Sequence, residues 1–547
     1  MTVLGTALDR GSEAFAQNRA DMLEMLGALD EQLQLAGQGG TEKAVARHKA
    51  AGKLTLRERV ALLIDPDTPF LEIGALAGYY TDYPVGGGAI VGIGTINGTE
   101  CVIFGNDPTV LGGALTQTSI PKIDRALQIA KQNRLPYVSL IESAGGDLRP
   151  RGNDIEEILK SSTFHFAGSG GFFYETTVLS GLGIPTVAIV FGSSTAGGAY
   201  MPGLSEYTIL VKDNAKVFLG GPPLVKVATG EESSDEELGG AEMHASVSGL
   251  ADYLAEDERD AIRQARDVVG HLHWRKAGPG PVSPGEEPVL DSEDLLGLVS
   301  KDLRQPLDVR EVIGRVVDGS RFEEFKARYG TTLVCGWAEI HGFAVGVLGN
   351  NGPLFPESSQ KASQFIQLCN KTSTPLVFLQ NITGYMVGKD YEQAGMVKWG
   401  SQMINALSNS AVPHVTVILG SSYGAGNYGM GGRGFGTRFV FLWPTAKIAV
   451  MGPQQIAGVM SIVRRAQAAR KGEEVDEALE KMITDAVAEV QERQSLAMYA
   501  SGRGVDDGVI DPRDTRTVIG LALSACHSAP VVGTGSAESC DAFGAFR

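Results

Sequence analysis

The chain has 547 residues, a hydrophobic content of 43% and a formal net charge of −17 at pH 7. This length predicts two or three domains, and the negative charge disfavours a broad basic face for nucleic acid. No apolar run is long enough to span a bilayer, and the N-terminal residues lack the basic start and apolar core of a signal peptide. We therefore expect a cytoplasmic protein without membrane or nucleic-acid partners. The five cysteines show no metal-ligand or disulfide-framework spacing, so no metal site is predicted.

Helical and extended patterns alternate along the chain. The predicted elements, in chain order, are a helix at 120–132, strands at 135–141 and 186–191, a helix at 358–370, strands at 375–380 and 415–419, and a long helix at 474–498. The strands are apolar runs without alternation, which is typical of strands buried on both faces. This order predicts an α/β fold with largely parallel sheets layered by helices.

Four segments of the first half return in the second half at offsets that fall in order. The offsets are 310 − 57 = 253, 342 − 98 = 244, 374 − 135 = 239 and 412 − 184 = 228. Chance matches would not fall steadily, whereas duplication followed by loop deletions would give this series. The Pro/Gly/acidic stretch 278–288 cannot continue a helix or strand. We therefore predict two homologous domains, residues 1–285 and 286–547.

Each half contains a strand that ends in Gly-Ser-Ser and runs into a turn of small residues, at 195–200 and at 423–430. A Gly-rich turn that enters a helix exposes backbone N–H groups, which suit an anion such as a phosphate or an enolate oxygen. The plain alternative is that these glycines only let helix and strand pack closely. Two turns in equivalent positions favour a pair of oxyanion sites.

Two other motifs overlap the second turn. Gly424, Gly426 and Gly429 satisfy the dinucleotide pattern G-x-G-x-x-G, but no acidic residue follows at the spacing that would bind a ribose. Ser422 satisfies the hydrolase pattern G-x-S-x-G, but the first half has Ala196 in place of the last glycine. None of the eight histidines lies in either turn, so no general base accompanies the glycines.

The segments that carry a resemblance are 47–55, 105–110, 195–200, 220–232 and 237–241 in the first half, and 349–357, 381–388 and 423–430 in the second half. The chain resembles the β subunits of acyl-CoA carboxylases in these segments and, more broadly, across residues 40 to 515. The second-half segments are similar to the 3-methylcrotonyl-CoA carboxylase branch rather than the propionyl-CoA branch.

The resemblance implies two crotonase-like (ClpP/crotonase) domains, with acyl-CoA on the N-terminal domain of one subunit and biotin on the C-terminal domain of another. By motif, the amides of Gly197 and Gly198 hold the thioester enolate oxygen, and those of Ala425 and Gly426 hold the biotin ureido oxygen. In the family's reaction, carboxybiotin releases CO2, the biotin nitrogen takes a proton from the acyl chain, and the enolate attacks CO2. This chemistry needs no protein base.

The resemblance also implies contacts around the four amides. The substrate-binding residues are Ala196, Ala199, Tyr200, Gly145 and Gly146, and the cofactor-binding residues are Gly424, Asn427, Tyr428 and Gly384. The chain has no Met-Lys-Met biotinylation motif and no ATP-using domain. A biotin carboxylase/biotin carrier α subunit is therefore the implied partner, and a hexamer of this chain is the implied assembly.

Several alternatives stay open at this point. Segments 147–154 and 170–174 differ from the methylcrotonyl pattern, so propionyl-, geranyl- or long-chain acyl-CoA are alternative substrates. The carboxyltransferase part of a decarboxylase would use the same amides. A hydratase or isomerase of the crotonase group needs poised carboxylates, for which Glu142 is the one evident candidate. A non-catalytic scaffold is disfavoured, because it has no reason to keep both glycine turns.

Overall fold

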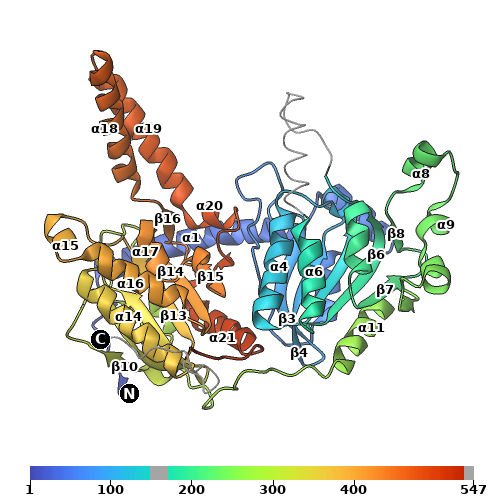
Figure 1. Ribbon diagram of the computed structural model, residues 1–547, viewed down its shortest axis with the longest axis horizontal. Coiled ribbons are helices and arrows are strands. Elements are labelled where there is room, and N and C mark those ends of the chain that lie inside the picture. Colours follow the sequence, from blue (N-terminus) through green and yellow to red (C-terminus); the bar gives the residue numbers. More distant parts are fainter. Residues whose placement is uncertain (148–169, 535–547) are drawn as a thin grey trace.

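Each half of the chain folds around its own β-sheet, with helices covering both sheets (Figure 1). The computed structural model describes residues 1–147 and 170–534. The first sheet has the strand order β2-β3-β4-β5-β6-β7-β9, with β8 beside β6. The second has the order β1-β10-β11-β12-β13-β14-β15-β17, with β16 beside β14. The second sheet thus repeats the first and adds β1 at its edge.

The strands are short at the edges of the two sheets and longer at the centre. They are β1 (Thr2–Val3), β2 (Leu71–Glu72), β3 (Ala89–Ile96), β4 (Thr99–Asn106), β5 (Tyr137–Ser143), β6 (Thr186–Thr195), β7 (Tyr207–Val211), β8 (Lys216–Phe218), β9 (Tyr253–Ala255), β10 (Arg321–Phe325), β11 (Leu333–Ile340), β12 (Phe343–Asn350), β13 (Leu376–Ile382), β14 (His414–Tyr423), β15 (Phe439–Leu442), β16 (Lys447–Ala449) and β17 (Gly508–Val509). The predicted strands correspond to β5, β6, β13 and β14.

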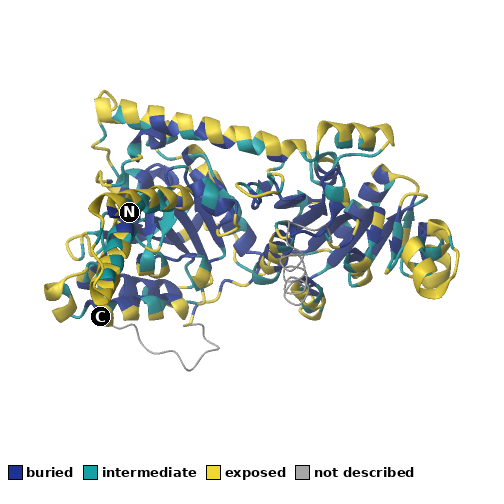
Figure 2. Ribbon diagram, turned by 90° about the horizontal axis from the view of Figure 1, so that it is seen from above, coloured by how far each residue is buried: buried dark blue, intermediate teal, exposed yellow. Residues whose placement is uncertain are grey.

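Each sheet with its helices forms one lobe of the molecule. Helices connect the strands and lie on the outside of each lobe. They are α1 (Glu13–Gln38), α2 (Glu42–Ala50), α3 (Leu56–Leu63), α4 (Ser119–Asn133), α6 (Gly171–Gly181), α7 (Tyr200–Gly203), α8 (Pro222–Thr229), α9 (Asp235–Gly239), α10 (Ala241–Met243), α11 (Glu258–His271), α12 (Leu295–Leu298), α13 (Val309–Ile313), α14 (Pro356–Lys371), α15 (Lys389–Gln393), α16 (Met396–Ser408), α17 (Gly424–Gly429), α18 (Pro453–Lys471), α19 (Glu477–Ser495), α20 (Ala497–Ser501) and α21 (Thr515–Cys526). Figure 2 shows buried strands inside and exposed helix surfaces outside.

The strand register confirms the duplication. Antiparallel pairing of β3 with β4 and of β11 with β12 is followed in both sheets by parallel strands. The pairing of β5 with β6 shifts between Ile141 and Ser143, and that of β13 with β14 shifts between Gln380 and Ile382. The differences 380 − 141 and 382 − 143 both equal 239, the offset found in the sequence for this strand. A shared irregularity at one register position is what two copies of one ancestral domain would keep.

The predicted long helix near the C-terminus is confirmed in its main part as α19. It ends three residues early, at Ser495, and is preceded by the antiparallel partner α18. Gly472, with a φ of 72°, ends α18 in the left-handed conformation that favours glycine. The two helices project from the second lobe as an arm (Figure 1).

The predicted linker 278–288 contains no helix or strand.

The N-terminal segment reaches across to the second half. β1 pairs antiparallel with β10. Along α1, the Asn18 amide donates to the carbonyl oxygen of Gly297 at 3.1 Å, and Lys301 pairs with Asp21 at 2.9 Å. The boundary at residue 285 stays a prediction, and the first 38 residues bind the two lobes together.

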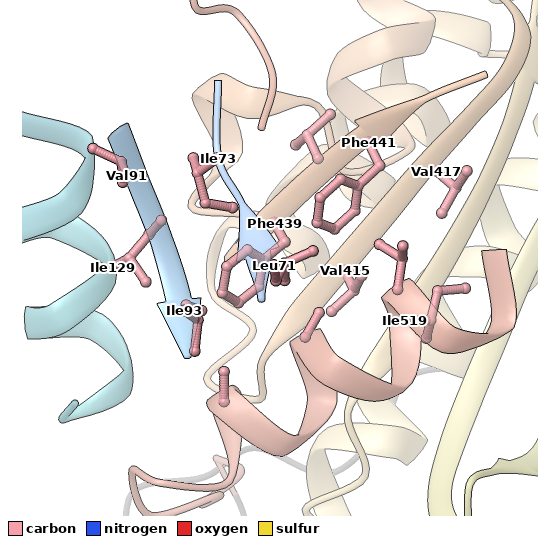
Figure 3. Close-up of a cluster of buried hydrophobic side chains, with 14 of the residues drawn as sticks. Leu71, Ile73, Val91, Ile93, Ile129, Val415, Val417, Phe439, Phe441 and Ile519 are labelled. Atoms are coloured by element: carbon pink, nitrogen blue, oxygen red, sulfur yellow. The ribbon is translucent and has the colours of Figure 1, made fainter. Parts of the chain in front are cut away.

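A shared hydrophobic core joins the lobes. Its members from both halves include Leu71, Ile73, Val91, Ile93 and Ile129, and Val415, Val417, Phe439, Phe441 and Ile519 (Figure 3). Each such side chain contributes about 1.5–3 kcal/mol when it is buried. Separating the lobes would expose them to water, so the two halves hold together as one body.

Ionic contacts between the halves surround Asp507, which is fully buried. Its carboxylate accepts hydrogen bonds from Arg125 Nε at 2.7 Å, from Arg433 Nη1 at 2.9 Å and from the backbone N–H of Val440 at 2.8 Å. Burial opposes the ionisation of Asp507, but the charges of Arg125 and Arg433 outweigh burial and lower its pKa. This network therefore ties β15 and β17 of the second half to α4 of the first.

The buried carboxyl of Asp506, next to Asp507 in the chain, should make the free energy of unfolding depend on pH. Its Oδ1 accepts from the hydroxyl of Ser501 at 2.9 Å, its buried Oδ2 has no partner among the described residues, and burial raises the pKa of its carboxyl to about 7. The folded protein therefore binds a proton that the unfolded chain has lost between about pH 4 and 7, so this group's contribution to stability falls as pH rises through that window. Asp506→Asn stays neutral. Urea unfolding should show the variant more stable than wild type at pH 8 and no more stable at pH 5, and an equal difference at both pH values would contradict this assignment.

Candidate active site

The two small-residue turns have the same backbone course. β6 ends at Thr195 and runs through a 3-10 turn at Ala196–Ala199 into α7, whereas β14 ends at Tyr423 and runs directly into α17. Ala196 has a φ of 52° and Gly424, its counterpart, a φ of 54°. Holding an alanine in this left-handed conformation costs about 1–3 kcal/mol, which indicates that the turn geometry is required. The N–H groups that follow lie in the first turn of a helical segment, where no preceding carbonyl accepts them.

A second loop faces each turn, and again the halves match. The N–H of Leu115 donates to the carbonyl oxygen of Gly145 at 2.8 Å, and the N–H of Leu354 donates to that of Gly384 at 3.1 Å. The differences 354 − 115 and 384 − 145 both equal 239. Parallel bridges join Leu115 to Gly146 and Leu354 to Tyr385. Gly145 and Gly384, predicted for different ligands, thus hold equivalent places.

The loop and the turn are so close that side chains do not fit between them. A Cβ atom added to Gly145 would lie 3.0 Å from the carbonyl oxygen of Thr195. One added to Gly426 would lie 2.7 Å from Ile382 Cγ1 and 3.0 Å from the Cα of Gly384. The structure therefore brings Gly145 to the first turn and Gly384 to the second, as the site prediction requires.

The remaining predicted site residues differ in exposure. Ala196, Gly146, Tyr200, Ala425 and Tyr428 are exposed, Gly197 and Asn427 are intermediate, and Gly198, Ala199 and Gly426 are buried. The buried Ala199 belongs to the hydrophobic core.

Phe173 and Leu115 border the first turn and were not among the predicted site residues. A Cβ atom at Gly197 would lie 3.6 Å from both Phe173 Cζ and Leu115 Cδ1, and the Phe173 ring stands 5.5 Å from that of Tyr200. Phe173 belongs to the divergent segment 170–174, which was the only sequence signal for it. The other divergent segment is 147–154. Apart from Asp147, it lies outside the described residues.

A chain of neutral hydrogen bonds supports the second turn from behind. The Asn427 amide donates to Ser422 Oγ at 2.8 Å, Ser422 Oγ donates to Gln380 Oε1 at 2.6 Å, and the Gln380 amide donates to the carbonyl oxygen of Met430 at 2.7 Å. The side chain of Asn427 is thus directed at Ser422, at the end of β14. Ser422 has amide partners and no histidine partner within residues 1–147 and 170–534, which disfavours the hydrolase interpretation.

Glu142, the acid that a hydratase would need, is occupied by two cations. Its carboxylate accepts from Lys53 Nζ at 2.5 Å and from Arg59 Nη2 at 2.8 Å. Burial opposes ionisation of Glu142, but the charges of Arg59 and Lys53 outweigh burial and lower its pKa. A carboxylate held in this state is a poor proton donor, so the hydratase interpretation loses its candidate acid.

Within residues 1–147 and 170–534, no group of three or more His, Cys, Asp or Glu side chains could hold a metal ion. No helix in the same part of the chain is long and apolar enough to cross a membrane.

Comparisons with known proteins identify the class. Residues 47–535 match the carboxyl transferase domain family. The chain is 53% identical over 546 residues to a Mycobacterium tuberculosis protein named "Probable biotin-dependent acyl-coenzyme A carboxylase beta2 subunit", covering 100% of both chains. It is 45% identical over 523 residues to the "Biotin-dependent 3-methylcrotonyl-coenzyme A carboxylase beta1 subunit" of the same organism, covering 95% of this chain and 97% of that one.

A solved structure agrees with both relatives. The β subunit of geranyl-CoA carboxylase from P. aeruginosa superposes with a TM-score of 0.88 at 42% identity, covering 97% of this chain and 98% of that one. The chain therefore belongs to the carboxyl transferase family, among the β subunits of biotin-dependent acyl-CoA carboxylases. The predicted enzyme class and the duplicated crotonase-like fold are confirmed. Such β subunits act on acyl-CoA with a biotin-carrying α subunit.

Proposed function

We propose that this chain moves CO2 from carboxybiotin, carried on a biotin carboxylase/biotin carrier α subunit, to an acyl-CoA enolate, and that the two turns hold the two reactants. The observation that carries this proposal is the pair of equivalent turns, each faced by an equivalent glycine loop. Two copies of one anion-binding geometry suit a reaction in which two carbonyl oxygens gain negative charge.

The first turn is the proposed acyl-CoA side. The amides of Gly197 and Gly198 would donate to the thioester oxygen as it becomes an enolate, with Ala196, Ala199 and Tyr200 around it. Gly145 would hold the facing loop against the turn, and Gly146, which has no atom within 4 Å of an added Cβ, would leave room for the thioester. Each preorganised donor is worth roughly 3–4 kcal/mol of transition-state stabilisation.

The second turn is the proposed biotin side, with the amides of Ala425 and Gly426 directed at the ureido oxygen. The residues present fit a flat bicyclic group that lies against the turn, because Gly384, Gly424 and Gly426 bring no side chain that would cover its amides. When bound, carboxybiotin supplies the CO2 and the group that accepts the substrate's proton. Tyr428 flanks the turn on its exposed side, and Asn427 braces it through Ser422.

A short branched acyl group of the 3-methylcrotonyl type is the proposed substrate. Phe173, Tyr200 and Leu115 give the space beside Gly197 an apolar, largely aromatic wall. Such a wall suits a planar unsaturated acyl chain. Propionyl-, geranyl- and long-chain acyl-CoA remain the alternatives, and one relative above is named for methylcrotonyl-CoA and another for geranyl-CoA.

A complete site is proposed to need two copies of the chain, with the N-terminal domain (1–285) binding acyl-CoA and the C-terminal domain (286–547) of a second copy binding biotin. The strands β6 and β14 that lead into the turns lie in different lobes (Figure 1). The arm formed by α18 and α19 exposes Ile462 by 67% and Met482 by 61%, which favours burial against another copy. We propose a hexamer.

The four described cysteines are free and buried, as in a reducing cytoplasm.

The test is ATP-dependent fixation of labelled bicarbonate by this chain with its biotin-carrying partner. Propionyl-, 3-methylcrotonyl-, geranyl- and long-chain acyl-CoA would be compared at equal concentration. Labelled product with one of them, highest for 3-methylcrotonyl-CoA, is expected. No product with any acyl-CoA, although the partner is carboxylated, would contradict the proposal, and net release of CO2 from a carboxyacyl-CoA would favour a decarboxylase.

A further inference from the structure

Four charged side chains form a closed cluster behind the first turn. Arg59 is fully buried and donates to Glu142 at 2.8 Å and to Glu258 at 2.7 and 3.0 Å. Lys53 donates to Glu142 at 2.5 Å and to the carbonyl oxygen of Phe191 at 3.4 Å. The Arg59 guanidinium also lies over the Phe191 ring, 4.2 Å from its centre. The cluster therefore connects α3 and α11 to the ends of β5 and β6.

The cluster holds the place where β5 and β6 separate before the site. Glu142 sits at the register shift between these strands, one residue before the end of β5. Its side chain lies on Gly192 of β6, where an added Cβ would be 2.4 Å from Glu142 Oε1. From that point β5 continues into the loop with Gly145 and β6 into the turn with Gly197. Any shift of Glu142 would therefore change the distance between the loop and the turn.

The second half builds the same separation without charges. At offsets of 253 and 239, Arg59 corresponds to Val312 and Glu142 to Asn381. Asn381 lies on Gly420 as Glu142 lies on Gly192, with an added Cβ 2.6 Å from Asn381 Oδ1. Its Oδ1 accepts from the N–H of Ser421 at 3.0 Å. One neutral amide is thus enough to form this strand geometry.

Other ion pairs, by contrast, occur in both halves. Arg57 pairs with Glu72 at 3.0 Å, and Arg310 pairs with Glu324 at 2.7 Å. In addition, Asp65 and Asp318 each accept two backbone N–H bonds in the following hairpin and each pair with an arginine. Pairs that the duplicated fold requires were kept twice. The four-residue cluster was not, which indicates a role specific to the first half.

We propose that Lys53, Arg59, Glu142 and Glu258 are positioning residues for the acyl-CoA side of the reaction, which fix the turn at 195–199 relative to the loop at 144–147. This inference rests on the proposed function of the first turn. A developing enolate is stabilised only by amides already in place, and an error of about 1 Å in such a site costs about 100-fold in rate. Rigid ion pairs to α3 and α11 anchor the amides to the body of the domain.

The test replaces the whole cluster by neutral residues, Lys53→Met, Arg59→Met, Glu142→Gln and Glu258→Gln together, so that no charge is left buried alone. The complex with the biotin-carrying partner is assayed in two ways. We expect kcat for acyl-CoA carboxylation to fall by about 100-fold with little change in the KM for acyl-CoA. Release of CO2 from the carboxylated partner without acyl-CoA, which depends on the second turn, should stay unchanged.

Glu72→Gln is the matched control, because it breaks an ion pair that both halves possess, and its kcat should equal that of wild type. Unchanged kcat in the neutral variant would overturn the inference. So would an equal loss in both assays, or failure of the variant to fold and assemble, since the cluster would then be a stabilising element. Wild type that carboxylates no acyl-CoA would instead contradict the proposed function, so the two failures are distinguishable.

Discussion

Gly426→Ala is expected to lower the rate of carboxylation by about 100- to 1,000-fold, the loss that follows removal of one oxyanion donor. The new Cβ would lie 2.7 Å from Ile382 Cγ1 and 3.0 Å from the Cα of Gly384. Because part of this contact is backbone, the turn must move away from the loop. Gly198 has slightly more space, with Ser143 Cβ at 3.1 Å, so valine is the sharper substitution there.

The measurement is the initial rate of labelled bicarbonate fixation with saturating acyl-CoA and carboxylated partner. Gly434→Ala and Gly203→Ala are the controls, since an added Cβ at either position meets no atom within 4 Å. Both controls should keep the wild-type rate. A Gly426→Ala enzyme as active as these controls would show that the second turn does not hold a reactant.

Asp507→Ala should destabilise the protein by about 3–5 kcal/mol, because it leaves the buried Arg125 and the half-buried Arg433 without their shared partner. The expected result is a large fall in the urea midpoint at pH 7 or failure to accumulate folded protein. Asp302→Asn is the matched control, because its ion pair with Arg304 is solvent-exposed and is worth at most about 1 kcal/mol. Equal midpoints for the two variants would contradict the role given to Asp507.

Much of the architecture was predictable because it is recorded in local patterns. The apolar runs at 135–141 and 375–380 correspond to β5 and β13, and the offset of 239 between them reappears in the register shift and in the loops at Gly145 and Gly384. Glycine turns are also local features, since a left-handed φ and a close approach restrict residue type. The equivalence of the two turns therefore followed from sequence.

Contacts between distant segments were not predictable. Arg59, Glu142 and Glu258 are separated by 83 and 116 residues, and each alone resembles an ordinary surface charge. The same holds for β1, whose two residues pair with β10 more than 300 positions later. Periodicity reports which face of an element is buried, but not which other element covers it. The interpretation of Glu142 as a possible acid was reversed for this reason.

Mixed oligomers test the central claim most directly, namely that each site combines the first turn of one copy with the second turn of another. Gly198→Val and Gly426→Val chains, each inactive alone, would be unfolded and reassembled together in equal amounts with the biotin-carrying partner. In a random two-fold pairing, half of the pairs are mixed and each contains one intact site, so about a quarter of the wild-type rate should return. No recovery, although mixed oligomers are present, would mean that each chain builds its own site.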